Sequence, residues 1–182
     1  MGAAPKRAHK TLILLKSAWI DTALGLMLVI ADDHQLYLLE FVEKRGIEKE
    51  IEKLHDRLPA SIVPGKTKSI ESIEKELKHY FAGKLKQFKT PFILIGTDFQ
   101  KNVWNALCDI RYGQTKSYAE QAQIINKPTA YRAVANANGM NQLAIIVPCH
   151  RIIRSHGELG GYGGGVARKQ WLLDHEKKYT RV

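Results

Sequence analysis

Residues 145–153 have the sequence Ile-Ile-Val-Pro-Cys-His-Arg-Ile-Ile, in which aliphatic runs flank a polar centre. Such runs are typical of buried strands, which hold a neighbouring side chain in a fixed position. Pro148 cannot continue a central strand, so we expect Cys149 where the strand breaks into a turn. His150 and Arg151 would give that thiol an electropositive setting, which lowers a cysteine pKa. The stretch predicts a reactive cysteine, and the alternative is a small buried hydrophobe beside a paired histidine.

Length and composition indicate a globular protein of one large or two small domains. Of its 182 residues, 45% are hydrophobic and 25% are charged, which excludes the disordered and fibrous classes. Cys108 and Cys149 are the two cysteines, so a disulfide scaffold is excluded and a reducing cytosolic compartment is expected. The best candidate for a membrane span, residues 24–31, is too short, so we expect a soluble protein with no membrane partner.

The charge of the chain indicates an acidic partner. The formal net charge is +10, which favours nucleic acid over an anionic membrane surface. Residues 1–95 hold 16 Lys and Arg against 12 Asp and Glu, whereas residues 96–182 hold 12 against 6. The second half is basic because it lacks acids, and we place the nucleic-acid face there. General solubility charge is the other interpretation.

The first half of the chain predicts a small α/β domain over residues 1–90. A basic arm at residues 1–10 precedes three strands rich in Leu, Ile and Val, and the short gaps between them favour an antiparallel meander. Two amphipathic helices follow, the first closed by Pro59 and the second by Gly83. The expected strands cover residues 12–20, 24–31, 35–42 and 61–63, and the expected helices cover residues 45–58 and 70–81.

The second half predicts a mainly helical domain over residues 91–182. Ser117 and Glu120 fit a capping box that opens a short helix, and Pro128 opens the next helix, which ends near Gly139. Two short helices joined by a tight turn form a helix-turn-helix pattern, which is found in DNA-binding proteins. The other expected elements are a linker or last strand at residues 91–96, a helix capped by Thr97 or Asp98, a Gly-rich loop at residues 160–165 that forms a pocket wall, and a last helix at residues 166–176 that buries Trp171 and Leu172.

Pro148-Cys149-His150-Arg151 between aliphatic runs resembles the active-site signature of the O6-alkylguanine-DNA alkyltransferases, or methylated-DNA–protein-cysteine methyltransferases. Further family motifs follow one another in order over residues 97–176. The resemblance implies a ribonuclease-H-like N-terminal domain and a C-terminal helix-turn-helix domain. The matching segments are Phe99-Gln100, Val103-Trp104, Tyr112-Gly113, Ser117-Tyr118-Ala119-Glu120, Arg132-Ala133-Val134, Asn141, the Gly-rich loop, Trp171-Leu172-Leu173 and His175-Glu176.

The family's chemistry assigns roles to the residues around the cysteine. The resemblance implies that Cys149 takes the alkyl group from O6-alkylguanine, and from O4-alkylthymine, once and irreversibly. A free thiol with a pKa of about 8.5 is only about 3% ionised at pH 7, so it needs a base. By resemblance, His150 takes the proton through a bridging water, Glu176 orients the imidazole and Asn141 braces the active-site turn.

The resemblance also implies how double-stranded DNA with alkylated bases is bound. Tyr118 would hydrogen-bond the flipped base, the carbonyls of Val147 and Cys149 would contact the guanine amine, and Arg132 would fill the space that the base leaves. The recognition helix would enter the minor groove. The expected DNA contacts are Thr129, Ala130, Arg132, Ala133 and Ala137.

Two departures bear on the substrate range. Ala144 and Gly163 border the alkyl pocket where some relatives have proline and serine, so the sequence leaves open the tolerance for bulky adducts. It also leaves open which of O6-alkylguanine and O4-alkylthymine is the preferred substrate. The resemblance implies no metal and no organic cofactor, because relatives' zinc-binding cysteines have no counterpart here. We expect a monomer in the cytoplasm, nucleoid-associated in a bacterium or nuclear in a eukaryote.

Three other functions compete with this prediction. A non-catalytic binder of alkylated DNA, similar to the alkyltransferase-like proteins, would have another residue in place of Cys149. A thiol hydrolase or peptidase using Cys149 and His150 would need an oxyanion site and turnover. A transcription regulator would need binding to a specific DNA sequence.

Overall fold

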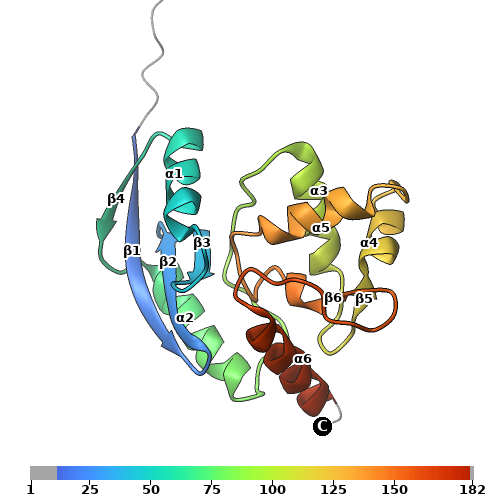
Figure 1. Ribbon diagram of the computed structural model, residues 1–182. Coiled ribbons are helices and arrows are strands. Elements are labelled where there is room, and N and C mark those ends of the chain that lie inside the picture. The colour runs from blue at the N-terminus through green and yellow to red at the C-terminus, as the bar shows by residue number, and fades with distance from the viewer. Residues whose placement is uncertain (1–11, 181–182) are drawn as a thin grey trace, which may run out of the picture.

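A computed structural model describes residues 12–180 of the chain. The predicted basic arm at residues 1–10 lies outside the described residues. Figure 1 shows an N-terminal sheet domain beside a helical C-terminal domain, with the last helix, α6 (Val166–Thr180), lowest in the view. Within residues 12–180, no helix is both long enough and apolar enough to cross a membrane.

The N-terminal domain is built on a four-stranded sheet with strand order β3-β2-β1-β4. The first three strands form the predicted antiparallel meander, and the short fourth strand runs parallel to β1. β2 and β3 are apolar along almost their whole length, and successive side chains point to opposite faces of the sheet. Each face therefore presents an apolar surface that a helix must cover. The strands are β1 (Ile13–Thr22), β2 (Gly25–Ala31), β3 (Leu36–Phe41) and β4 (Ala60–Pro64).

The two faces of the sheet are buried by different partners. Helix α1 (Ile47–Arg57) covers one face through Leu54, which is 1% exposed. Helix α2 (Lys68–Phe81) packs on the other face, and the same apolar core continues into the C-terminal domain through Val103 and Leu172. A core shared by both domains fixes the position of the sheet relative to the C-terminal residues that follow.

The C-terminal helices begin where the sequence supplies capping groups. Thr97 caps α3 (Asp98–Cys108) in a capping box with Gln100, and Ser117 does the same for α4 (Tyr118–Ile124) with Glu120. Helix α5 (Tyr131–Gly139) completes the predicted helix-turn-helix. A two-stranded parallel sheet of β5 (Lys116–Ser117) and β6 (Ile152–Ile153) ties the start of α4 to the segment after Cys149.

Three details of the sequence prediction were wrong. Residues 145–147 are buried, but they form a turn with Ile145 at a φ of 72°, because their hydrogen bonds close locally instead of joining the sheet. Helix α5 begins at Tyr131, since Pro128 and the next residue form a turn. Trp171 is 37% exposed and stacks on His175, whereas Leu172 is buried as predicted.

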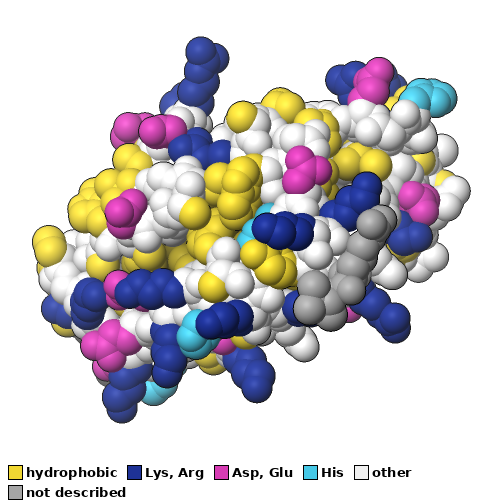
Figure 2. Space-filling view, turned by 90° about the horizontal axis from the view of Figure 1, so that it is seen from below, with side chains coloured by type: hydrophobic (Ala, Val, Ile, Leu, Met, Phe, Trp, Pro, Cys, Tyr) yellow, Lys and Arg dark blue, Asp and Glu magenta, His cyan; other side chains and the backbone are white. Residues whose placement is uncertain are grey.

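The surface charge is distributed over the molecule. On the face seen in Figure 2, Lys and Arg side chains are spread over both domains, with Asp and Glu side chains among them. The net charge of +10 is therefore not gathered into one patch on that face, and a DNA surface must be located from the elements themselves.

Candidate active site

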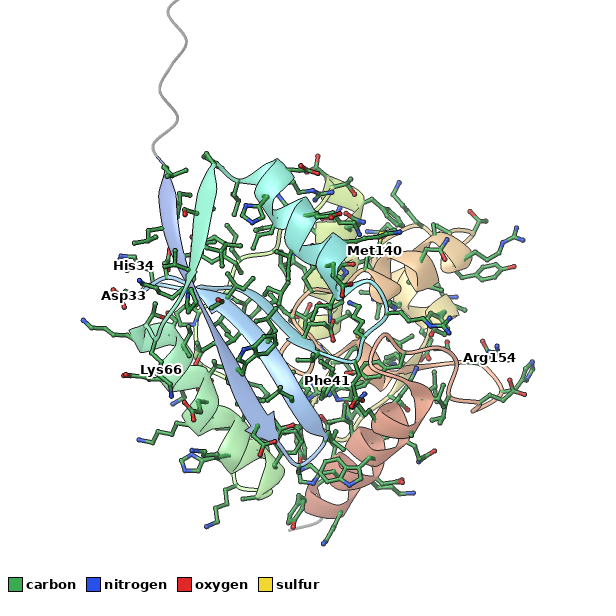
Figure 3. The ribbon with its side chains drawn as sticks, turned by 60° about the vertical axis from the view of Figure 1, so that its left-hand side comes forward. Asp33, His34, Phe41, Lys66, Met140 and Arg154 are labelled. Carbon is green, nitrogen blue, oxygen red and sulfur yellow. The ribbon has the colours of Figure 1, made fainter. Side chains whose placement is uncertain are left out.

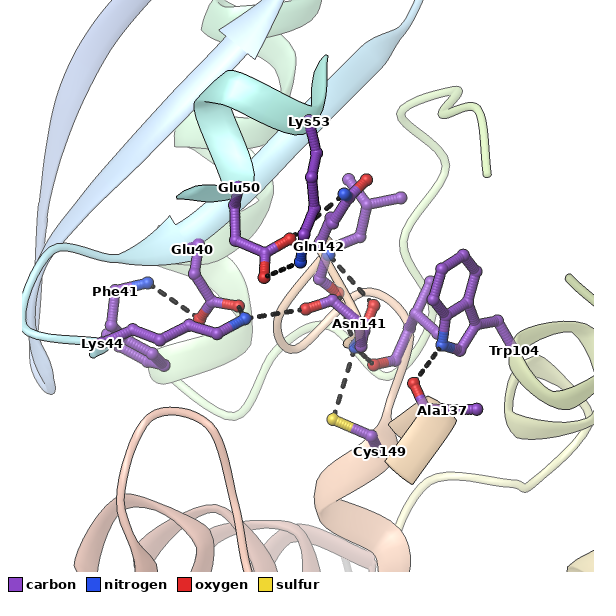
Figure 4. A network of polar contacts seen from close by, with 12 residues as sticks. Glu40, Phe41, Lys44, Glu50, Lys53, Trp104, Ala137, Asn141, Gln142 and Cys149 are labelled. Carbon is purple, nitrogen blue, oxygen red and sulfur yellow. Dashed lines mark hydrogen bonds and ion pairs between the residues drawn. The ribbon is translucent and has the colours of Figure 1, made fainter. Parts of the chain in front are cut away.

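Cys149 lies at the start of a short 3-10 helix, η1 (Cys149–Arg151), directly after the buried turn. Its Sγ accepts a hydrogen bond from Asn141 Nδ2 at 3.3 Å (Figure 4). Burial raises the pKa of the Cys149 thiol, and the Asn141 amide and the ammonium groups of Lys44 and Lys169 act in the opposite direction. The thiol is therefore protonated at neutral pH and needs a base.

A buried histidine and glutamate lie behind the cysteine. His150 Nε2 is 2.9 Å from Glu176 Oε1, and neither side chain is exposed. Glu176 also accepts hydrogen bonds from Arg151, Tyr80 and the Gly113 N–H, each at 2.9 Å. Burial by itself would raise the pKa of the Glu176 carboxyl, but the bonds with His150 and Arg151 outweigh burial and hold this pKa well below its ordinary value. The carboxylate is therefore ionised and acts only as an acceptor.

This arrangement fixes the protonation of the imidazole. Because Glu176 accepts, His150 Nε2 carries the proton, and Nδ1 is left as the basic nitrogen. Burial lowers the pKa of His150 against the attraction of Glu176, so the ring is neutral at pH 7. His150 Nδ1 is buried and has no hydrogen-bond partner among the described residues. The site thus contains a buried neutral base next to Cys149.

The sequence prediction of an electropositive setting named the wrong cations. Arg151 does not serve the thiol, since its Nη1 donates to the Ile110 carbonyl at 2.5 Å and its other N–H groups bind Glu176. The cations that act on Cys149 are Lys44 of the N-terminal domain and Lys169 of α6. Neither was predicted, because their burial depends on contacts between distant segments.

Lys169 is a fully buried lysine that carries its charge without a carboxylate partner among the described residues. Its Nζ donates to the Ile152 carbonyl at 2.5 Å and to the Gly161 carbonyl at 3.2 Å. Burial lowers the pKa of Lys169 to about 8. One sequence signal was present, because Lys169, Leu172 and Glu176 share one side of α6 at helical spacing.

Asn141 holds the turn that precedes the cysteine. Its Nδ2 donates to the Val147 carbonyl at 2.8 Å and its Oδ1 accepts from the Leu143 N–H at 3.0 Å. These bonds close a loop whose apolar side chains point into the core, so the backbone polar groups are satisfied without a strand. The predicted bracing residue therefore touches both the turn and the Cys149 sulfur.

A cavity of about 360 Å³ opens on Cys149. Tyr118 of α4 lies on one side, Ala135 and Asn136 of α5 on another, and Gly163 of the Gly-rich loop on a third. Burial raises the pKa of Tyr118, so its hydroxyl keeps its proton and can donate a hydrogen bond. The volume suits a small organic ligand, and the sulfur lies at its wall. The structure therefore brings together Tyr118, Gly163 and Cys149, and it adds Ala135 and Asn136, which the sequence prediction missed.

Comparison with known proteins identifies the family. The "6-O-methylguanine DNA methyltransferase, ribonuclease-like domain" matches residues 15–94, and the "6-O-methylguanine DNA methyltransferase, DNA binding domain" matches residues 98–178. The methylated-DNA–protein-cysteine methyltransferase of Methanosarcina barkeri is 42% identical over 162 residues, which are 89% of this chain and 97% of that protein. The chain belongs to this methyltransferase family.

Other methyltransferases of the family agree with this assignment. The inducible Bacillus subtilis protein of the same name is 46% identical over 136 residues, or 75% of this chain and 76% of the relative. The crystal structure of Mycobacterium tuberculosis OGT in complex with DNA superposes with a TM-score of 0.77 at 40% identity, covering 92% of this chain and 94% of that one. The thiol hydrolase and the transcription regulator are thereby set aside.

In this methyltransferase, the predicted DNA contacts lie on or next to α5. Thr129, Arg132 and Ala133 are exposed, and Ala130 is half-buried at the helix start. Arg132 lines a shallow cleft of about 400 Å³ together with Tyr118 of α4, and this cleft adjoins the Gly-rich loop. This cleft adjoins the cavity over the cysteine, because Tyr118 and Gly161 line both.

Two predicted contacts of the methyltransferase need correction. Ala137 is only 3% exposed, because it packs under α3 and its carbonyl accepts from Trp104 Nε1 at 2.8 Å, so its side chain is not on the DNA-facing surface. The Val147 carbonyl already accepts from Asn141 Nδ2 and from the Cys149 N–H, each at 2.8 Å, so it has no lone pair left for a guanine amine. The Cys149 carbonyl accepts the Ile152 N–H.

Within residues 12–180, His, Cys, Asp and Glu side chains form no group of three that would hold a metal ion.

Proposed function

We propose that this methyltransferase repairs DNA by moving the alkyl group of O6-alkylguanine onto Cys149. The observation that carries the proposal is the position of Cys149, which lies at the wall of the cavity with the His150–Glu176 pair buried behind it. Family membership supports the reaction, and the geometry supports Cys149 as the acceptor and His150 as the base. The alternative of a non-catalytic DNA binder has no use for a thiol placed between a cavity and a base.

The proposed reaction is a direct displacement. The thiol proton passes to His150 Nδ1 through a water molecule, and the imidazolium is stabilised by the Glu176 carboxylate. Sγ then forms a bond to the alkyl carbon as the bond from that carbon to O6 breaks, and the electron pair stays on the guanine, which takes up a proton. The products are an intact guanine and a thioether on Cys149. Because a thioether is not hydrolysed, each protein molecule acts once.

The base must leave the duplex to reach the sulfur. Flipping a base costs a few kcal/mol, and the cost is lowest for a damaged base that pairs poorly. We propose that Arg132 enters the stack in its place, that Tyr118 hydrogen-bonds the flipped base, and that α5 approaches the minor groove. Exposed Ala133 supports this, since a small side chain beside Arg132 allows the duplex to come close.

The proposal is tested by label transfer from duplex DNA that carries O6-methylguanine with a labelled methyl group. The full-length protein is expected to take up label, Cys149→Ser is expected to take up none, and Cys108→Ser is the matched control, because Cys108 lies outside the cavity. Label on Cys149→Ser at the native level would overturn the assignment of the acceptor.

We further propose that the protein acts as a monomer in the compartment that holds DNA. That compartment is the cytoplasm, at the nucleoid, if the source is a bacterium, and the nucleus if it is a eukaryote. Sedimentation of the free protein and of its DNA complex tests the proposed monomer, and a stable dimer of the free protein would contradict it.

A further inference from the structure

A second, smaller cavity lies against Cys149 on the side of the N-terminal domain. Its volume is about 10 Å³, which is about one water-sized sphere. Cys149 and Gly163 line both this cavity and the large one, as do Asn138, Gly139 and Tyr162, so the two spaces adjoin beside Cys149. Ala144 lines only the small cavity, and Glu40 and Lys44 form the wall that the N-terminal domain contributes to this cavity.

The position of the small cavity matches the path of a transferred group. A base in the large cavity presents its O6 substituent to the sulfur, and the substituent must be accommodated beside Sγ once the new bond forms. The small cavity lies next to Cys149 between the C-terminal end of α5, which contributes Asn138 and Gly139, and the N-terminal domain, which contributes Glu40 and Lys44. A methyl group is about the size of that space, whereas a benzyl group is several times larger.

The wall that the N-terminal domain contributes is a buried ion pair between Lys44 and Glu40. Lys44 Nζ lies 2.7 Å from Glu40 Oε2, and the two side chains are 5% and 4% exposed (Figure 4). The same Nζ donates to the Asn141 carbonyl at 3.1 Å, and Glu40 Oε1 accepts the Phe41 N–H at 3.0 Å. These contacts hold the lysine chain in one place. Moving it would leave a buried carboxylate without its partner, which is costly.

The lysine also closes the space opposite the Gly-rich loop. A Cβ atom added to Gly163 would lie 3.2 Å from Lys44 Cε, so the aliphatic part of Lys44 already lies against the loop. The N-terminal domain, which holds none of the reacting groups, therefore bounds one side of the space beside the sulfur.

From this geometry we infer that the Lys44–Glu40 pair is the specificity-determining wall of the alkyl pocket and restricts transfer to methyl and similarly short groups. The inference rests on the proposed alkyl transfer to Cys149. It adds that the N-terminal domain limits the size of the alkyl group that can be transferred, because the Lys44 side chain occupies space beside the sulfur.

The test compares two double variants that both remove the charge of the pair. Glu40→Gln with Lys44→Ala shortens the wall, whereas Glu40→Gln with Lys44→Met keeps its length. For each protein, the rate of transfer from O6-benzylguanine in a duplex is divided by the rate from O6-methylguanine in the same duplex. We expect the Lys44→Ala pair to raise this ratio at least about tenfold. The Lys44→Met pair is expected to leave it within about threefold of the native value.

Two results would overturn the wall. One is an unchanged ratio in a Lys44→Ala double variant that still transfers methyl. The other is an equal rise in the Lys44→Met double variant, since that would assign the effect to charge and not to length. Should both double variants fail to fold, Lys44→Arg decides, because it keeps a cation beside Glu40 and enlarges the side chain that forms the wall. A fall in its ratio supports the wall, and an unchanged or higher ratio overturns it.

This comparison separates the wall from the underlying reaction. If the native protein transfers no methyl group, alkyl transfer itself fails. If native methyl transfer is intact and the ratios do not change, only the wall fails.

Discussion

At the residue scale, Glu176 organises the site because its one carboxylate accepts hydrogen bonds from four residues. It binds His150 and Arg151 through charge-assisted contacts, and it accepts the Tyr80 hydroxyl and the Gly113 N–H. These bonds keep the carboxylate ionised in a buried position and fix which nitrogen of His150 is basic. The same residue therefore supports both catalysis and stability.

Glu176→Gln tests that double role. An amide no longer compensates the buried Arg151 charge and no longer fixes the imidazole tautomer. We expect the rate of methyl transfer to fall by about 10²- to 10⁴-fold and the free energy of unfolding to fall by about 3–5 kcal/mol. The matched control is Glu158→Gln, which removes an exposed partner of Arg154 and is expected to change neither. A Glu176→Gln protein with native rate and stability would contradict the account.

The stability of the protein is predicted to decrease in acid, in two stages. The pKa of His150 is lowered by burial, so below its unfolded value of about 6.5 the unfolded chain binds the proton more readily and stability is lost. The pKa of Glu176 is also lowered in the fold, so a further loss begins below its unfolded value of about 4.3 and continues as pH falls toward its folded value.

Denaturant unfolding at pH 7, 5.5 and 4 measures this loss. His150→Asn is expected to flatten the decrease between pH 7 and 5.5, whereas His156→Asn, which changes an exposed histidine, should keep the native profile. A native protein that is equally stable at pH 7 and pH 4 would exclude the assignment of both groups.

At the scale of elements, the helix-turn-helix and the last helix divide the work. Helix α5 exposes Arg132 beside the cleft that leads to the cavity. Helix α6 places Lys169 and Glu176 on its buried side, against the Gly-rich loop and η1. The proposed role of α5 is to bind the duplex, and the proposed role of α6 is to hold the groups that activate Cys149, so a change in one helix should leave the function of the other intact.

Arg132→Ala separates the proposed binding of the duplex from the chemistry at Cys149. We expect transfer from duplex DNA to fall at least about tenfold, because the flipped state loses the side chain that fills the vacated stack. Transfer from the free O6-methylguanine base needs no flipping and is expected to fall less. Lys66→Ala is the control, since it removes a cation that projects from the N-terminal domain, far from Arg154 and the C-terminal loop (Figure 3). Equal losses on duplex and free base would rule out the proposed role of Arg132.

Local chemistry explains which elements could be predicted from the sequence. The meander follows from turn residues between apolar runs, and the starts of α3 and α4 follow from capping boxes that each lie within four residues. The turn at residues 145–147 could not be predicted in this way, because it depends on the Asn141 side chain, which binds the Val147 carbonyl, and on the Leu39 carbonyl, which holds the Ala144 N–H just before the turn. An aliphatic run with non-local partners has the same pattern as a strand.

The candidate site divides in the same way. Cys149, His150, Asn141 and Glu176 carry family motifs and lie together as the resemblance implied. Lys44 and Lys169 carry no motif, and their roles arise only from burial against distant segments.

At the scale of the whole molecule, the two domains act as one body because they share a core. Phe41, at the end of β3, is fully buried, and the Arg168 guanidinium of α6 lies 4.6 Å from its ring centre. Figure 3 shows Phe41 between the sheet and the C-terminal segments. Because the domains share a core, Lys44 of the N-terminal domain lines the same small cavity as Cys149.

Phe41→Ala tests whether the shared core stabilises both domains together. Deleting a buried phenylalanine is expected to lower the free energy of unfolding by about 3–5 kcal/mol. Both domains should still unfold in one transition, followed by circular dichroism and by Trp fluorescence. Trp19→Ala, which changes an exposed residue of the sheet, is expected to stay within about 0.5 kcal/mol of the native protein. Two separate transitions in the native protein would show that the domains are independent.

The central claim is that Cys149 accepts one alkyl group and is not regenerated, and intact mass spectrometry tests it most directly. The protein is incubated with an excess of duplex DNA that contains O6-methylguanine, and the modified residue is located by peptide mapping. We expect the mass of one added methyl group, located on Cys149, with no further repair after one equivalent of DNA. An unchanged mass, a methyl group on another residue, or continued repair beyond one equivalent would contradict it.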